Sequence, residues 1–132
     1  MILPVDILYP YADKLTSLDE AIMLTKTHGG HLHILYTYRL FHKPEPATLG
    51  SPLEMRRQEI HTNLEAMRQK LDVAGIAYTL KVEIGFMKDR LAIQLDNHPF
   101  DTVLIDPKHP EFKEIQQAIR EHHQSAVRIL AS

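Results

Sequence analysis

Extended segments and helical segments alternate along the whole chain, and this alternation is the feature that most restricts its fold. Strand-like runs are expected at residues 5–9, 31–38, 78–84, 102–105 and 127–130. A helical pattern separates each run from the next. Parallel strands need such crossover connections, and the helices then cover both faces of the sheet. The sequence therefore predicts an α/β fold with a parallel sheet, and 132 residues suffice for a single domain over 1–132.

Local signals mark where the helices begin and end. Helical periodicity is expected over residues 18–28, 52–74, 88–97 and 111–122. Ser17 and Glu20 have the spacing of a capping box, in which each side chain binds a free backbone N–H group. Ser51 and Glu54 form a second such pair. Residues 39–50 carry prolines and no periodic pattern, which predicts a surface loop.

The run at 78–84 differs from the other strand-like runs because it alternates strictly. Leu80, Val82 and Ile84 share one face, and polar residues occupy the other. A strand covered on one side only has this pattern, so we expect it at an edge of the sheet. The run at 102–105, TVLI, is apolar throughout, as expected of a strand buried on both faces.

Composition excludes several classes of function. The chain has no cysteine, which excludes disulfides, thiol nucleophiles and thiolate metal sites. Its formal net charge of −2 provides no basic excess for nucleic acid. No segment has the length of a membrane span, and the first residues lack the basic region of a signal peptide. We therefore expect a cytoplasmic protein that contacts neither nucleic acid nor membrane.

Four segments, in order along the chain, resemble the universal stress protein family. Ile7-Leu8-Tyr9-Pro10 with Asp13 resembles the first strand of that family, usually I-L-x-P-x-D. The segment 29–36, GGHLHILY, resembles its helix exit and second strand. The segments 82–85, VEIG, and 101–105, DTVLI, resemble its third and fourth strands. A second register for the first strand stays open, because residues 3–6, LPVD, resemble the family's P-V-D.

The resemblance implies a detailed architecture. It implies a five-stranded parallel sheet of order 3-2-1-4-5 with two helices on each face. Family members often pair as homodimers through the fifth strand, where Val127, Ile129 and Leu130 would supply the contact surface. Many members bind ATP at the carboxyl ends of strands one and four, where the strand order reverses.

The chain departs from the family at the phosphate-binding loop. ATP-binding members carry G-x-x-G, nine further residues, then G and Ser or Thr. The residues at the corresponding positions are Asp106, His109, Ile119 and Arg120. Asp106 would repel a triphosphate, and Pro107 and Pro110 remove two backbone donors. We therefore expect no ATP binding through this loop and no bound cofactor.

Two hypotheses for function follow. The first is a non-catalytic regulatory module that acts as a homodimer and through an unknown protein partner. The alternative is a small-ligand or nucleotide-binding protein, such as one for ATP or AMP. It would use the cleft at the carboxyl ends of strands one and four, lined by Pro10, Asp13, Asp106 and His109. No catalytic residue is predicted, although weak nucleotide hydrolysis stays open in the alternative.

The histidines raise a separate question. Nine histidines are present, and His31 and His33 share one face of the second strand, with His28 shortly before them. Two imidazoles at this spacing can share a metal ion, but no carboxylate or cysteine at a fixed spacing completes the set. We expect hydrogen-bonded histidines and no metal site, and the alternative is a site formed by His28, His31 and His33.

Overall fold

The computed structural model describes residues 5–12, 15–38, 52–122 and 126–131, excepting the side chains of 52–54, 56 and 126. The predicted loop 39–50, Ser51 and Asp13 lie outside this part of the chain. The described elements are β1 (Asp6–Pro10), α1 (Leu15–His28), β2 (His31–Tyr38), α2 (Pro52–Ala74), β3 (Ala77–Ile84), α3 (Met87–Asn97), β4 (Thr102–Ile105), α4 (Phe112–His122) and β5 (Ala126–Ile129).

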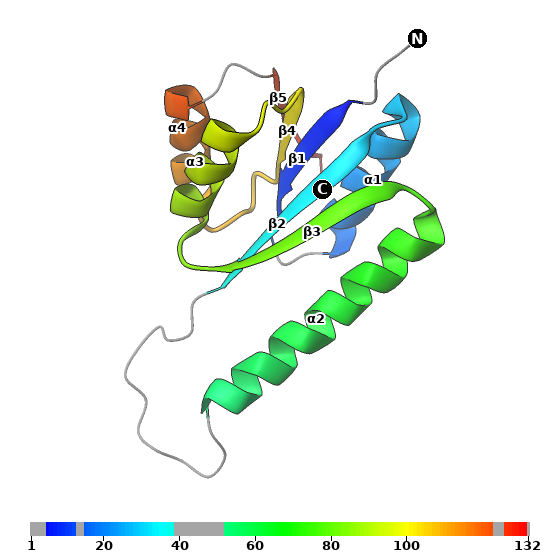
Figure 1. Cartoon of the computed structure of the whole chain (residues 1–132), viewed down its shortest axis with the longest axis vertical. Helices are drawn as coiled ribbons and strands as arrows, with labels where there is room; N and C mark the ends of the chain where they lie inside the picture. The colour runs from blue at the N-terminus through cyan, green and yellow to red at the C-terminus, as the bar shows by residue number, and fades with distance from the viewer. Residues whose placement is uncertain (1–4, 13–14, 39–51, 123–125, 132) are drawn as a thin grey trace.

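The sheet has five parallel strands in the order β3-β2-β1-β4-β5 (Figure 1). This order confirms the predicted α/β fold. It also confirms that the alternating strand, β3, lies at an edge, because β3 pairs with β2 alone. The sheet reverses its direction of growth at β1, since β2 pairs on one side of β1 and β4 on the other.

The sheet has one hydrophobic cluster on each face. On one face, Leu18 of α1 and Leu71 of α2 pack with side chains of β1 and β2. On the other, Leu91 of α3 and Ile115 of α4 pack with side chains of β4. Two helices therefore cover each face, as Figure 1 also shows. Such coverage explains why β1 and β4 are buried at every position after their first residue.

Side-chain alternation decides what lies at the beginning of β1 and β2. Leu32 and Ile34 of β2 face the α1/α2 cluster, so His31 and His33 point to the opposite face. Leu8 of β1 packs in the α3/α4 cluster, and Asp6, two residues earlier, lies on that face too. The first residues of the neighbouring strands β1 and β2 thus direct polar side chains toward the face that α3 covers.

The predicted capping box at Ser17 is wrong. Helix α1 begins at Leu15, so Ser17 lies inside its first turn and is fully buried. Its Oγ is hydrogen-bonded to the Tyr9 hydroxyl at 2.7 Å. Glu20 instead accepts the backbone N–H of Ala131, at 3.0 and 2.9 Å to its two oxygens. The two polar residues therefore connect α1 to β1 and to the segment after β5.

Among the helices of the described ranges, none combines sufficient length with sufficient apolar character to span a membrane.

Candidate functional site

The segment between β4 and α4 uses its polar groups internally. Asp106 Oδ1 accepts the N–H of Lys108 at 2.8 Å, and the Asp106 carbonyl oxygen accepts the N–H of His109 at 3.0 Å. His109 Nδ1 in turn accepts the N–H of Glu111 at 2.9 Å. The His109 carbonyl oxygen accepts the N–H of Phe112 at 3.1 Å. An Asx turn followed by a tight turn therefore leads into α4.

This arrangement determines what the head of α4 can bind. Pro107 and Pro110 have no N–H group. Every other backbone N–H from residue 107 to residue 112 already has an acceptor inside the segment. Phosphate sites at helix N-termini depend on free N–H groups that point at the anion. Within the described segment 107–112, no N–H is left in that state.

The carboxylate of Asp106 is the most deeply buried charged group here. Its side chain is 0 % exposed, and Oδ2 has no hydrogen-bond partner among the described residues. His109 beside it is buried as well. Glu111 Oε2 accepts the N–H of Met87 at 3.2 Å, which connects the beginning of α4 to the beginning of α3. The segment between β4 and α4 is thus fixed by its own hydrogen bonds and by the contact with α3.

The predicted cleft residues are partly brought together. Pro10 is the last residue of β1 and is buried, and Asp106 directly follows β4, which pairs with β1. Both lie at the carboxyl ends of neighbouring strands, as predicted. Asp13 lies outside the described residues. Ile119, which the resemblance sets at a glycine position of the phosphate-binding loop, is buried in the α3/α4 cluster.

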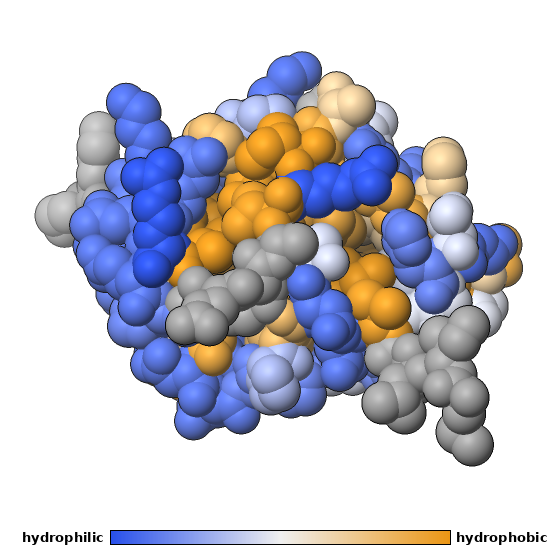
Figure 2. All heavy atoms as spheres, turned by 90° about the horizontal axis from the view of Figure 1, so that it is seen from above, coloured by the Kyte–Doolittle hydropathy of each residue, from blue (hydrophilic) through white to orange (hydrophobic). Residues whose placement is uncertain are grey.

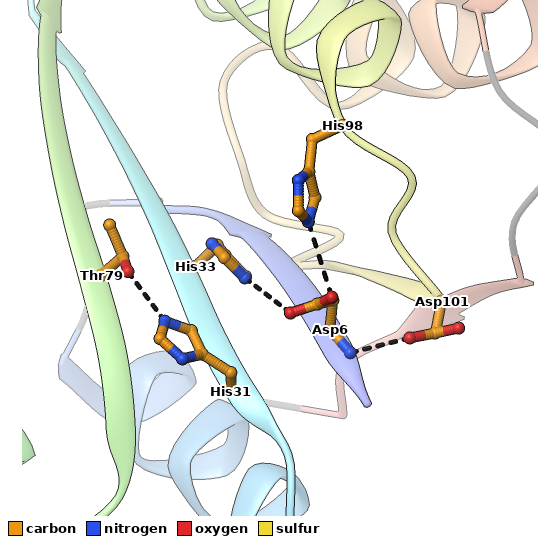
Figure 3. A network of polar contacts seen from close by, with 6 residues as sticks. All are labelled: Asp6, His31, His33, Thr79, His98 and Asp101. Atoms are coloured by element: carbon orange, nitrogen blue, oxygen red, sulfur yellow. Dashed lines mark hydrogen bonds and ion pairs between the residues drawn. The ribbon is translucent and has the colours of Figure 1, made fainter. Parts of the chain in front are cut away.

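A second group of polar residues lies at the opposite end of the sheet (Figure 3). His33 Nε2 of β2 donates a hydrogen bond to Asp6 Oδ1 of β1 at 2.9 Å. His98 Nε2, from the segment after α3, lies 3.5 Å from the other carboxylate oxygen, Oδ2. We call Asp6, His33 and His98 the histidine cluster. These three residues offer ligand atoms that all lie within 4.8 Å of one another.

Neighbouring groups support the histidine cluster. Asp101 Oδ2 accepts the backbone N–H of Asp6 at 2.8 Å. The rings of His31 and His33 have centroids 4.4 Å apart, and His31 Nε2 is hydrogen-bonded to Thr79 Oγ1 at 2.7 Å. Phe100 contacts the His33 and His98 rings, with centroids at 5.2 and 4.5 Å.

The charges of the histidine cluster follow from these contacts. The hydrogen bond from His33 lowers the pKa of Asp6 below its ordinary value, against the opposing effect of burial. Burial of the His31 ring, with the neighbouring His33, lowers the pKa of His31. The cluster therefore combines an ionised carboxylate with imidazole groups.

His28 does not join the histidine cluster. It lines a pocket of about 370 Å³ together with Val5, Ile7, Leu24 and Arg128, at the beginning of β1 and β4. Hydrophobic side chains gather on the face that carries these strand ends (Figure 2). Ile7 belongs to the α1/α2 side of the sheet, whereas the His33 ring lies on the other side. Among the described residues, the set that can hold a metal contains Asp6 and His98 in place of His28 and His31.

Comparisons with known structures place the fold. Universal stress protein UspA from Lactobacillus plantarum matches with a TM-score of 0.70 and 16% identity, over 98% of this chain and 99% of that one. A universal stress protein in complex with cAMP matches with a TM-score of 0.65 and 12% identity, over 97% and 98%. The chain has the fold of the universal stress proteins.

A universal stress protein from Arabidopsis thaliana with AMP bound shares the same fold. It matches with a TM-score of 0.61 and 15% identity, over 96% of this chain and 91% of that one. No protein-family model matches the sequence, and a search of curated proteins found no match. In the universal stress protein fold, the switch between β1 and β4 is the position where open α/β sheets usually bind ligands.

The other edge of this universal stress protein fold is β5. Val127 and Ile129 are exposed there, and their register partners Val103 and Ile105 lie in the α3/α4 cluster. Leu130 differs from the prediction, because its side chain is only 2 % exposed and packs in the α1/α2 cluster. Its backbone N–H donates to Ile105 at 2.8 Å. Leu130 is therefore not part of the exposed surface of β5.

Proposed function

We propose that this protein is a non-catalytic regulatory module with the universal stress protein fold, which acts through protein contacts and not through ATP occupancy. The observation that carries the proposal is the internal use of every backbone N–H between residues 107 and 112. A triphosphate bound at the head of α4 would have to break the Asx turn at Asp106 and the bond from Glu111 to His109. The Asp106 carboxylate would also repel the triphosphate. At a fully buried position little water is present to screen the two negative charges from each other.

The test is a calorimetric titration of the full chain with ATP and magnesium. We expect no saturable heat of binding at concentrations up to the millimolar range. Micromolar affinity for ATP, lost on replacing Lys108 or His109 by proline, would contradict the proposal, since it would show that the segment before α4 does hold the phosphates.

We also propose that the module is a homodimer paired through β5. An edge strand has unpaired backbone groups, and here it adds the exposed side chains of Val127 and Ile129. Pairing with the same strand of a second copy would satisfy the backbone and cover both side chains.

Ultracentrifugation of a charged variant tests this pairing. Ile129→Lys is expected to shift the chain from dimer to monomer, while Val73→Lys, on an exposed position of α2, leaves the dimer intact. A wild-type chain that sediments as a monomer, or an Ile129→Lys variant that stays dimeric, would argue against the β5 interface.

The alternative, a ligand site at the switch between β1 and β4, keeps one observation in its favour. Asp106 Oδ2 is buried without a hydrogen-bond partner among the described residues, and structures with this fold hold cAMP or AMP. A carboxylate in this position is suited to ribose hydroxyl or amino groups, not to phosphate. Titration with AMP and cAMP separates the two proposals: micromolar binding that Asp106→Asn weakens would favour the alternative.

A further inference from the structure

We propose that the histidine cluster of Asp6, His33 and His98 binds a divalent transition-metal ion of the zinc class. The two imidazole nitrogens and the carboxylate come from β1, β2 and the segment that joins α3 to β4. Figure 3 shows both histidine rings directing a nitrogen toward the same carboxylate. Nothing in the phosphate-loop region takes part, so this inference is independent of the proposed function.

The donor set has the chemistry that such an ion prefers. Two imidazole nitrogens and one carboxylate oxygen are borderline ligands that suit zinc, nickel, cobalt and copper more than magnesium or calcium. Both rings offer Nε2, so the ion takes Nε2 of each ring while the proton sits on Nδ1. For His33, whose Nε2 donates to Asp6 without the ion, this means that the ring proton moves from Nε2 to Nδ1 when the ion binds. One carboxylate charge against a doubly charged ion leaves a net positive charge of one. A water molecule would complete four ligands, and a hydroxide in its place would also neutralise the charge.

The distances require only small movements. Tetrahedral zinc with bonds of about 2.0–2.1 Å holds its ligand atoms about 3.3 Å apart. His33 Nε2 already lies 2.9 Å from Asp6 Oδ1, and His98 Nε2 lies 3.5 Å from Oδ2. The widest separation among the three ligand atoms is within 4.8 Å. Rotation of the side chains, without a change of backbone, is enough to close the site around an ion.

His98 provides a second observation that points to a ligand. Its Nε2 atom is buried, yet it makes no hydrogen bond to any described residue. The 3.5 Å distance to Asp6 Oδ2 is short enough for an ion pair but too long for a good hydrogen bond. A buried nitrogen without a hydrogen-bond partner destabilises the folded state. An ion between His98 and Asp6 would supply the missing contact.

The surroundings of the histidine cluster hold the ligands in place and leave their side chains partly exposed. Parallel pairing of β1 with β2 sets Leu8 opposite His33 and Asp6 opposite His31, which fixes the spacing of the two ligands on the sheet. The Asp101 carboxylate holds the backbone of Asp6. The side chains of His33, Asp6 and His98 are 23, 35 and 43 % exposed, so solvent contacts part of each, although the Nε2 atom of His98 is itself covered.

A bound ion would connect three segments that lie far apart along the chain. It would hold the segment after α3 against the first residues of β1 and β2. Because an ion that binds only the folded state stabilises that state, the site would raise the free energy of unfolding of the domain. The site lies at the amino ends of the strands, away from the switch point that the alternative function would use.

The experiment titrates zinc chloride into the chelator-treated full chain by calorimetry. We expect one equivalent of zinc to bind to the wild type. His98→Ala and Asp6→Asn are each expected to lower the affinity at least tenfold, because each removes one of three protein ligands. Far-UV circular dichroism confirms that the variants fold, and His98 is exposed enough to tolerate replacement.

Two control variants make the result specific. His122 forms a similar pair with Asp96, at 3.0 Å, and Glu121 lies 4.0 Å from its other ring nitrogen, but these three do not form a group of ligand atoms within 4.8 Å in the described part of the chain. His122→Ala and His28→Ala are therefore expected to bind zinc as the wild type does. Cobalt gives a second readout, since its visible absorption reports imidazole and carboxylate ligands and is expected to disappear in His98→Ala.

Three outcomes would overturn the proposal. The first is a wild type that shows no saturable zinc binding. The second is a His98→Ala variant that is folded and binds zinc with unchanged affinity. The third is a loss of binding in His28→Ala equal to that in His98→Ala, which would favour the site built on His28, His31 and His33.

Discussion

The side chains of Tyr78 and Asp72 meet across the turn between α2 and β3, where the Tyr78 hydroxyl donates to Asp72 Oδ1 at 2.9 Å. This pair illustrates how single residues in this chain set local chemistry without burial in the core. The carboxylate accepts a hydrogen bond from the phenol O–H, so it favours the neutral phenol. The hydrogen bond to Asp72, followed by burial, raises the pKa of Tyr78 above 10.0.

This pair predicts a pH dependence of stability. A raised folded-state pKa means that the unfolded chain releases its phenol proton first, so the stabilisation is complete below pH 10.0 and is lost as pH rises through the folded pKa. Tyr78→Phe is expected to remove this part of the alkaline loss. The check is urea denaturation at a series of pH values above and below that range. An unchanged alkaline slope in Tyr78→Phe would contradict the assignment.

At the candidate site, Asp106 is a second residue whose side chain sets the local structure. A glycine at this position would leave the loop free to present N–H groups, whereas the aspartate collects one of them on its own Oδ1. The Asp106 side chain thereby satisfies one N–H group of the strand-to-helix connection within the turn itself.

At the scale of elements, short connections decide how each helix returns to the sheet. Gly30 lies between α1 and β2, where a Cβ atom would come within 2.6 Å of the carbonyl oxygen of Val5. The next residue, His31, donates its N–H to that same oxygen at 2.8 Å. The close approach of the α1–β2 connection to β1 thus depends on the absence of a side chain.

Gly30→Ala is expected to lower the free energy of unfolding by about 1–3 kcal/mol, because the backbone must move and the bond from His31 to Val5 is strained. Gly75→Ala is the comparison. Its φ is +68° and no atom lies within 4 Å of an added Cβ, so only conformational strain is expected there, about 1 kcal/mol. Urea denaturation measures both. A neutral Gly30→Ala would show that the connection is looser than described.

At the scale of the whole molecule, one sheet joins the two hydrophobic clusters. Adjacent residues of β1 belong to different clusters, Ile7 to one and Leu8 to the other. Loss of packing on either face therefore removes support from the same strands. We expect the two faces to unfold in one cooperative transition, as small single domains usually do.

Leu91→Ala tests this coupling. The side chain is fully buried in the α3/α4 cluster, so its truncation is expected to lower the free energy of unfolding by about 2–5 kcal/mol. The chain has no tryptophan, and Tyr9, Tyr11 and Tyr36 lie in the α1/α2 cluster, so fluorescence reports the opposite face. The urea midpoint is expected to shift equally by fluorescence and by circular dichroism. A fluorescence midpoint that stays in place would mean that the faces unfold separately.

The order of elements and the edge position of β3 could be predicted from the sequence, because they depend on local periodicity and on the connections that parallel strands require. The exposed part of the β5 edge, Val127 and Ile129, could also be named in advance, whereas the burial of Leu130 depends on where the chain turns after the strand.

Of the two candidate sites, one could be predicted in part from the sequence and the other could not. The lack of N–H groups at Pro107 and Pro110 is visible in the sequence, since a backbone donor is a property of residue type. The histidine cluster is not, because its ligands come from two strands and a connection that have no fixed spacing along the chain. Only strand pairing and the packing of α3 on the sheet bring His98 to Asp6, and those are decided by the tertiary structure.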